Sequence, residues 1–63
     1  MKKIYLTMNE SNDVAESYRG KIFKAYEDDS GFYVIPAKEC PGGKDITDAW
    51  IPLKYIKKIE SRN

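Results

Sequence analysis

Two β-rich runs joined by a tight turn place the strongest constraint on how this chain can fold. Residues 20–27 and 32–36 are rich in aromatic and branched side chains, and the link between them reads Asp28, Asp29, Ser30, Gly31. This composition predicts an antiparallel hairpin built on a type I turn, with Gly31 at positive φ where the second strand begins. Pro36 is expected to end that strand, because proline has no N–H to donate to a ladder.

Three more strands are predicted around the hairpin. Residues 3–8 place Ile4, Leu6 and Met8 on one face and polar or aromatic residues on the other, which is typical of a half-buried strand. Trp50 and Ile51 resume a strand later in the chain.

Pro52 is expected to begin a short 3₁₀-like turn over residues 52–55, followed by a last strand over residues 56–60. The spacing of Ile56 and Ile59 also fits a helical turn. We prefer a strand, because so few residues remain before the polar terminus that an independent helix is not expected.

Two polar segments connect these elements. Residues 9–19 fit either a short helix capped by Ser11 or Asn12 or an irregular loop, with Gly20 placed to end a helix. The side chains of that segment able to face a core are Val14, Ala15 and Tyr18. Residues 37–48 hold the sequence Cys-Pro-Gly-Gly-Lys at 40–44, which indicates a flexible surface loop rather than a regular element.

The composition excludes several classes of function. The 63 residues fit one domain, 1–63, with a thin core. With 11 basic and 10 acidic residues the net charge is +1, so the charge balance does not indicate a strongly charged partner. Cys40 is the only cysteine and histidine is absent, so we expect no disulfide, zinc site or Cys–His nucleophile. No cofactor is implied. Short apolar runs predict no secretory signal and no membrane span, and therefore a cytoplasmic protein.

The one acidic run, Glu27, Asp28 and Asp29, has two interpretations. It offers carboxylates to a hard cation or to a basic partner, but calcium loops need a longer alternation of oxygen ligands. A solvated hairpin turn is the simpler interpretation. Paired carboxylates for catalysis would need a pocket of roughly 300 Å³ or more, for which a domain of this size has little room. We therefore expect a protein that is not an enzyme.

Residues 49–56, which read Ala-Trp-Ile-Pro-Leu-Lys-Tyr-Ile, resemble the end of the SH3 domain family. The family pattern there is glycine, aromatic, aliphatic, proline, any residue, asparagine, tyrosine, aliphatic, and this chain differs at Ala49 and Lys54. The chain is also similar in pattern to small SH3-like barrels of bacteria and their phages. The resemblance implies an all-β, five-stranded SH3-like barrel. In the family, residues at the places of Pro52 and Tyr55 line a peptide groove; we extend the resemblance to the barrel and not to its ligand.

The many aromatic residues, together with a balanced net charge, predict a non-enzymatic protein-binding module. Such a module could be an accessory protein of a phage or mobile element. The expected partner contacts are the residues 37–44 and four aromatic side chains, Tyr26, Tyr33, Trp50 and Tyr55. Trp50 and Tyr55 have a competing assignment. We expect them to be in the core or half-buried, because a small domain needs its only Trp there, and to act as interface residues only if exposed.

The alternative function is weak nucleic-acid binding along a basic edge formed by Lys54, Lys57 and Lys58, joined by Lys2 and Lys3 if the terminal strands are neighbours. Lysines beside an aromatic residue can follow a phosphate backbone while a base stacks. The competing interpretation is structural, because lysines on an edge strand prevent it from pairing with other chains.

Overall fold

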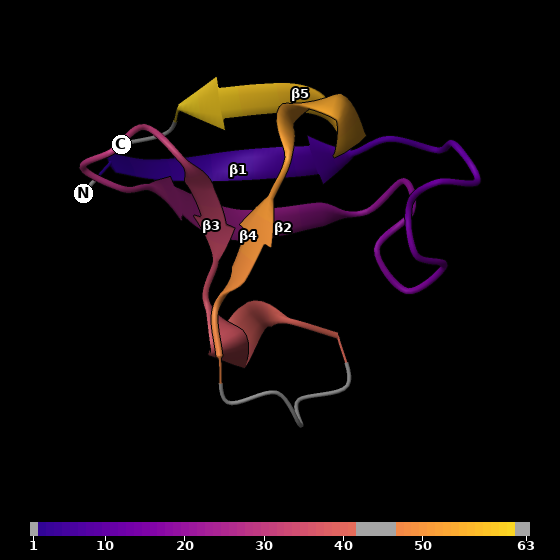
Figure 1. Cartoon of the computed structure of the whole chain (residues 1–63), viewed down its shortest axis with the longest axis horizontal. Helices are drawn as coiled ribbons and strands as arrows, with labels where there is room; N and C mark the ends of the chain where they lie inside the picture. The colour runs from indigo at the N-terminus through magenta and orange to yellow at the C-terminus, as the bar shows by residue number, and fades with distance from the viewer. Residues whose placement is uncertain (1, 42–46, 62–63) are drawn as a thin grey trace.

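The fold is one antiparallel sheet of five strands in the order β4-β3-β2-β1-β5 (Figure 1). The computed structural model describes residues 2–41 and 47–61. The elements are β1 Lys2–Met8, β2 Ile22–Glu27, β3 Tyr33–Ile35, η1 Ala37–Glu39, β4 Ala49–Ile51, η2 Leu53–Tyr55 and β5 Ile56–Ser61, where η is a 3₁₀ turn. The predicted β-rich fold is confirmed. Strands β4 and β5 remain the two edges, so the sheet is not closed into a barrel.

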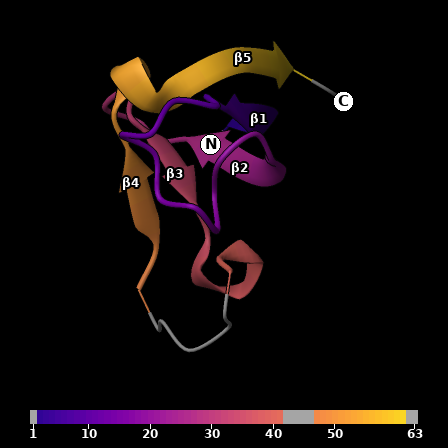
Figure 2. The same cartoon turned by 90° about the vertical axis from the view of Figure 1, so that its right-hand side faces the viewer.

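The sheet bends sharply between its two parts. Strands β5, β1 and β2 run roughly side by side, whereas β3 and β4 cross them steeply and extend away from them (Figures 1 and 2). The bend creates an inner face, where the core lies, and an outer face that is turned toward solvent.

The core follows from the alternation of β1. Leu6 lies between Phe23 on β2 and Ile59 on β5, and Ile4 lies opposite Ala25. The predicted inward face of this strand is therefore confirmed, because its apolar residues are buried while Tyr5 and Thr7 point the other way. The buried cluster consists of Ile4, Leu6, Met8, Val14, Phe23, Ala25, Ile35 and Cys40.

The central hairpin forms as predicted. Its turn is closed by backbone hydrogen bonds from Asp28 N to Phe32 O (2.9 Å) and from Gly31 N to Asp28 O (3.0 Å). The carboxylate of Asp28 accepts two more, from the N–H of Ser30 at 2.9 Å and of Phe32 at 2.8 Å. Gly31 takes a φ of +88°, a conformation that favours glycine over every residue with a Cβ.

The segment between β1 and β2 is a series of turns without a helix, so the loop alternative holds there. Its base is closed by hydrogen bonds from Met8 N to Lys21 O and from Gly20 N to Asn9 O. Val14 is buried in the core, and the ring of Tyr18 packs 5.3 Å from that of Phe23, measured between centroids. Of the three side chains able to face the core, Ala15 does not do so, because it is exposed.

Two prolines begin the two 3₁₀ turns. Pro36 precedes η1 and Pro52 precedes η2, in both cases ending a strand as its missing N–H requires. The segment after Pro36 was expected to be a loop without a regular element. It instead forms η1, which a hydrogen bond from Cys40 N to Ala37 O closes, and the side chain of Cys40 is buried in the core.

Part of the predicted flexible loop, including Gly42, Gly43 and Lys44, lies outside the described residues.

The C-terminal prediction is confirmed as a turn followed by a strand. Asn9 anchors the turn to the end of β1, since its N–H donates to Tyr55 O at 2.8 Å and its side-chain amide to Lys54 O at 3.0 Å. Strand β5 then pairs with β1, so the terminal strands are neighbours. The helical segments in the described ranges are all too short and polar to cross a membrane.

Candidate functional site

A second group of apolar side chains lies on the outer face of the sheet, away from the core. Tyr26, Val34 and Trp50 occupy directly opposite positions on β2, β3 and β4 and so form one row across the sheet. Val34 is only 1% exposed although it does not belong to the main core cluster. Its burial follows from the two large rings on either side of it, since side chains directly opposite in a sheet pack against each other.

An exposed aromatic stack borders this row. The rings of Phe32 and Trp50 lie 5.3 Å apart between centroids at an interplanar angle of 19°, a stacked arrangement favourable for aromatic pairs. Phe32 remains 52% exposed and Trp50 64% exposed. The expectation that Trp50 is in the core is therefore wrong. Its neighbour Ile51 packs against the core instead, and successive strand residues point to opposite faces.

We call Tyr26, Phe32, Val34 and Trp50 the outer aromatic patch. Two aspartates hold it in place. Both backbone groups of Phe32 are bonded to Asp28 in the hairpin turn, which fixes the position from which its ring reaches Trp50. Asp48 accepts hydrogen bonds from Ala37 N at 3.0 Å and from the Tyr26 hydroxyl at 2.9 Å, so it ties the start of β4 to β2 across the end of β3.

The carboxylates also set the electrostatics of the patch. The pKa of Tyr26 is raised above its usual value of 10.0, first by the hydrogen bond to Asp48, then by burial, and further by the charges of Asp48 and Asp28. Each cause favours the neutral phenol, because a phenolate would lose the hydrogen bond and face two negative charges.

We expect the titration of Tyr26 to depend on Asp48. The substitution Asp48→Asn should lower the pKa of Tyr26 toward its usual value, because it removes a negative charge and the acceptor carboxylate. The hydrogen bond stabilises the fold below pH 10, and this stabilisation should be lost as the pH rises through the raised pKa of Tyr26. Tyrosinate absorbance followed against pH measures this, with Tyr26→Phe identifying the contribution of Tyr26. An unchanged pKa in Asp48→Asn would contradict the assignment.

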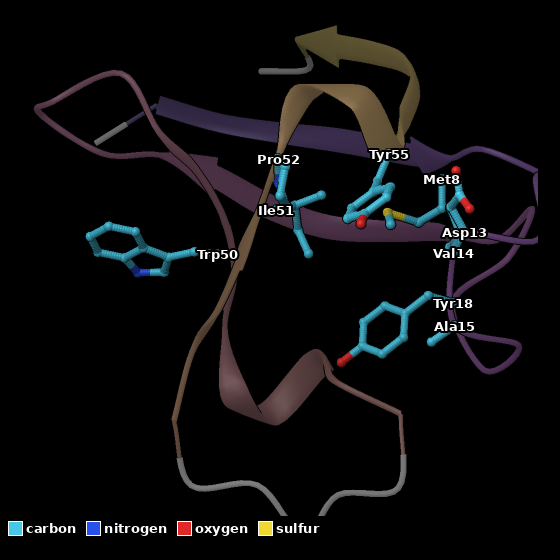
Figure 3. Close-up of a pocket in the computed structure, with 9 residues that line it drawn as sticks. All are labelled: Met8, Asp13, Val14, Ala15, Tyr18, Trp50, Ile51, Pro52 and Tyr55. Atoms are coloured by element: carbon cyan, nitrogen blue, oxygen red, sulfur yellow. The ribbon is translucent and has the colours of Figure 1, made fainter.

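A groove lies on the opposite side of β4 from the aromatic stack. It has a volume of about 260 Å³, below the ~300–1,000 Å³ usual for small-molecule sites. Tyr55, Ile51 and Tyr18 surround it, whereas the indole of Trp50 points away on the far side of β4 (Figure 3). The lining residues are Met8, Asp13, Val14, Ala15, Tyr18, Trp50, Ile51, Pro52 and Tyr55.

The four predicted partner contacts do not share one surface. Tyr26 and Trp50 belong to the outer row. Tyr33 and Tyr55 are half-buried and pack against the core, and of these two only Tyr55 lines the groove. The half-buried position expected for Tyr55 is thus confirmed. Phe32 was not among the predicted contacts. It lies two residues before Val34, so the alternation of strand side chains could have placed it on the same face once the hairpin register was known.

Of the three predicted nucleic-acid contacts, Lys57 and Lys58 lie on the edge strand β5 and Lys54 lies in η2 just before it, and each ammonium has a neighbour within the chain. Lys57 lies 3.6 Å from Glu10 and Lys58 lies 3.4 Å from Glu60, measured from Nζ to Oε1, while the ammonium of Lys54 lies 5.1 Å from the ring centroid of Tyr55. Lys2 and Lys3 sit at the other end of β1, since Lys58 pairs opposite Thr7. The five lysines are therefore spread along the sheet.

Within the described residues, no group of three or more Cys, Asp or Glu side chains could hold a metal ion. The thiol of Cys40 is buried, 3.4 Å from Pro36 O and 3.7 Å from Ile35 O. Comparison of the chain with models of known protein families, with curated proteins and with solved structures found no match.

Proposed function

We propose that this chain is a non-enzymatic protein-binding module that docks on a larger partner through the outer aromatic patch. The observation that carries the proposal is the exposed stack of Phe32 and Trp50. A domain this small has few large side chains with which to fill a core, yet it leaves its one tryptophan mostly in solvent. Trp and Tyr are also the residues that dominate interface energies.

The position of the patch at an edge of the sheet supports the same function. Strand β4 is an edge strand with the sequence Ala-Trp-Ile, whereas the opposite edge, β5, carries Lys57 and Lys58. Lysines discourage an edge from pairing with another chain. The two edges therefore differ in protection, and the unprotected one borders the aromatic stack.

We also propose that the chain is related to the small SH3-like barrels of bacteria and phages, with its sheet left open between β4 and β5, and that it has an accessory role for a phage or mobile element. Five strands and a 3₁₀ turn between the last two fit that plan. Pro52 and Tyr55, which hold the places of groove residues in SH3 domains, both line the groove beside β4.

Capture of partners from a bacterial lysate tests the function, with the tagged protein used with and without nuclease. A stoichiometric protein that survives nuclease treatment is the expected result. Retention that disappears with nuclease would instead favour nucleic-acid binding through Lys54, Lys57 and Lys58, which also predicts that affinity falls steeply with salt. That alternative has less support, because two of these lysines already face carboxylates.

A further inference from the structure

Charge is unevenly distributed over the outer face of the sheet. Its lysines, Lys3, Lys24 and Lys58, belong to β1, β2 and β5. Strands β3 and β4 carry no charged residue, and the segments that enter them carry aspartates: Asp28 and Asp29 before Phe32, and Asp48 before Trp50. In the row through Tyr26, Lys3 is three strands away from Trp50, a distance of about 14 Å.

From this arrangement we infer that the outer aromatic patch binds an arginine side chain of the partner protein. The inference rests on the proposed docking function and names the chemistry of the partner. A guanidinium can stack on the open face of the Trp50 indole while it meets a carboxylate of Asp48 or Asp29. Arginine fits better than lysine, because the planar guanidinium both stacks on a ring and donates two parallel hydrogen bonds.

The same charges disfavour the other occupants of such a surface. A single-stranded nucleic acid could stack its bases on Trp50, but its phosphates would then lie near the three aspartates. Of the two arginines of this chain, Arg19 and Arg62, Arg19 donates two hydrogen bonds to Val14 O at 3.2 and 3.0 Å, so it is not free to bind the patch of a second copy.

The fluorescence of Trp50 provides a direct test, because the chain has one Trp. A short capped peptide in which arginine alternates with alanine is titrated into the intact protein, beside matched lysine and glutamate peptides and a thymidine oligonucleotide. The arginine peptide should give a saturable change in emission that weakens as salt is added. The lysine peptide should bind about 2–5-fold more weakly, and the glutamate peptide and the oligonucleotide should leave the emission unchanged.

Carboxylate variants locate the bound peptide. Asp48→Asn and Asp29→Asn should each weaken the arginine peptide about 2–5-fold, while Asp13→Asn, the same change in the groove on the other side of β4, should leave affinity unchanged. Asp29 is exposed in the turn, so its substitution keeps the test valid if Asp48→Asn disturbs the fold, which circular dichroism would reveal.

Equal responses to the arginine and glutamate peptides, or a loss of binding in Asp13→Asn alone, would overturn the arginine site. A partner captured through Trp50 with no response to arginine would overturn this inference and leave the docking function standing. If the arginine peptide gave no response and no partner were captured through Trp50, the docking function would be contradicted as well.

Discussion

Replacement of Leu6 by alanine is expected to lower the free energy of unfolding by about 2–5 kcal/mol. Leu6 is 0% exposed and lies on the strand between β2 and β5, facing Phe23 on one side and Ile59 on the other. Truncation would leave a cavity that these neighbours can fill only in part. A domain of 63 residues has roughly 3–9 kcal/mol of stability in total, so much of the fold depends on this one side chain.

Leu53→Ala is the matched control for that change. It removes the same atoms from a leucine that is 68% exposed in η2, so the free energy of unfolding should change by about 0.5 kcal/mol or less. Urea unfolding followed by circular dichroism gives both values. Similar losses in the two variants would mean that Leu6 is not the centre of the core.

Trp50→Ala is expected to weaken partner capture by about 30-fold or more, the loss that corresponds to an interface hot spot of ~2 kcal/mol. The fold should survive, because the indole is mostly in solvent; the change removes its contact with Phe32 and one of the two rings beside Val34. Capture of the partner identified in the lysate, measured at equilibrium for both proteins, gives the ratio of affinities.

Ile22→Ala controls for the loss of any exposed apolar side chain. Ile22 is also exposed on the outer face, but it stands opposite Thr7 at the other end of β2. Its truncation should leave capture unchanged. If Trp50→Ala captured as well as the parent protein while its circular dichroism spectrum persisted, the patch would not be the docking surface. If Trp50→Ala were unfolded, Trp50 would instead be a structural residue.

Local patterns were sufficient to predict the hairpin, β1 and the final turn and strand. In each case adjacent residues carry the information: the turn residues 28–31, the alternation of β1, and the proline that begins η2. These signals depend on backbone geometry within a few residues. They therefore remain informative without knowledge of the tertiary contacts.

Which side chains of β4 point to the outer face of the sheet could not be predicted in the same way. Its residues, Ala49, Trp50 and Ile51, contain no polar position to mark the outer side, and β3 is equally apolar. The side is set by the pairing of Val34 with Trp50, a contact across a long connection. The burial of Cys40 also depends on distant contacts, since its partners in the core come from other strands.

The accessibility of Trp50 is the most direct test of an exposed docking patch. Acrylamide quenching of its fluorescence can be compared between the folded protein and the chain unfolded in urea, with no other Trp to confuse the signal. With the indole 64% exposed, we expect a quenching constant in the folded protein close to that of the unfolded chain. A constant several-fold smaller would show that Trp50 is shielded in the core, and would contradict the docking surface proposed for this face of the sheet.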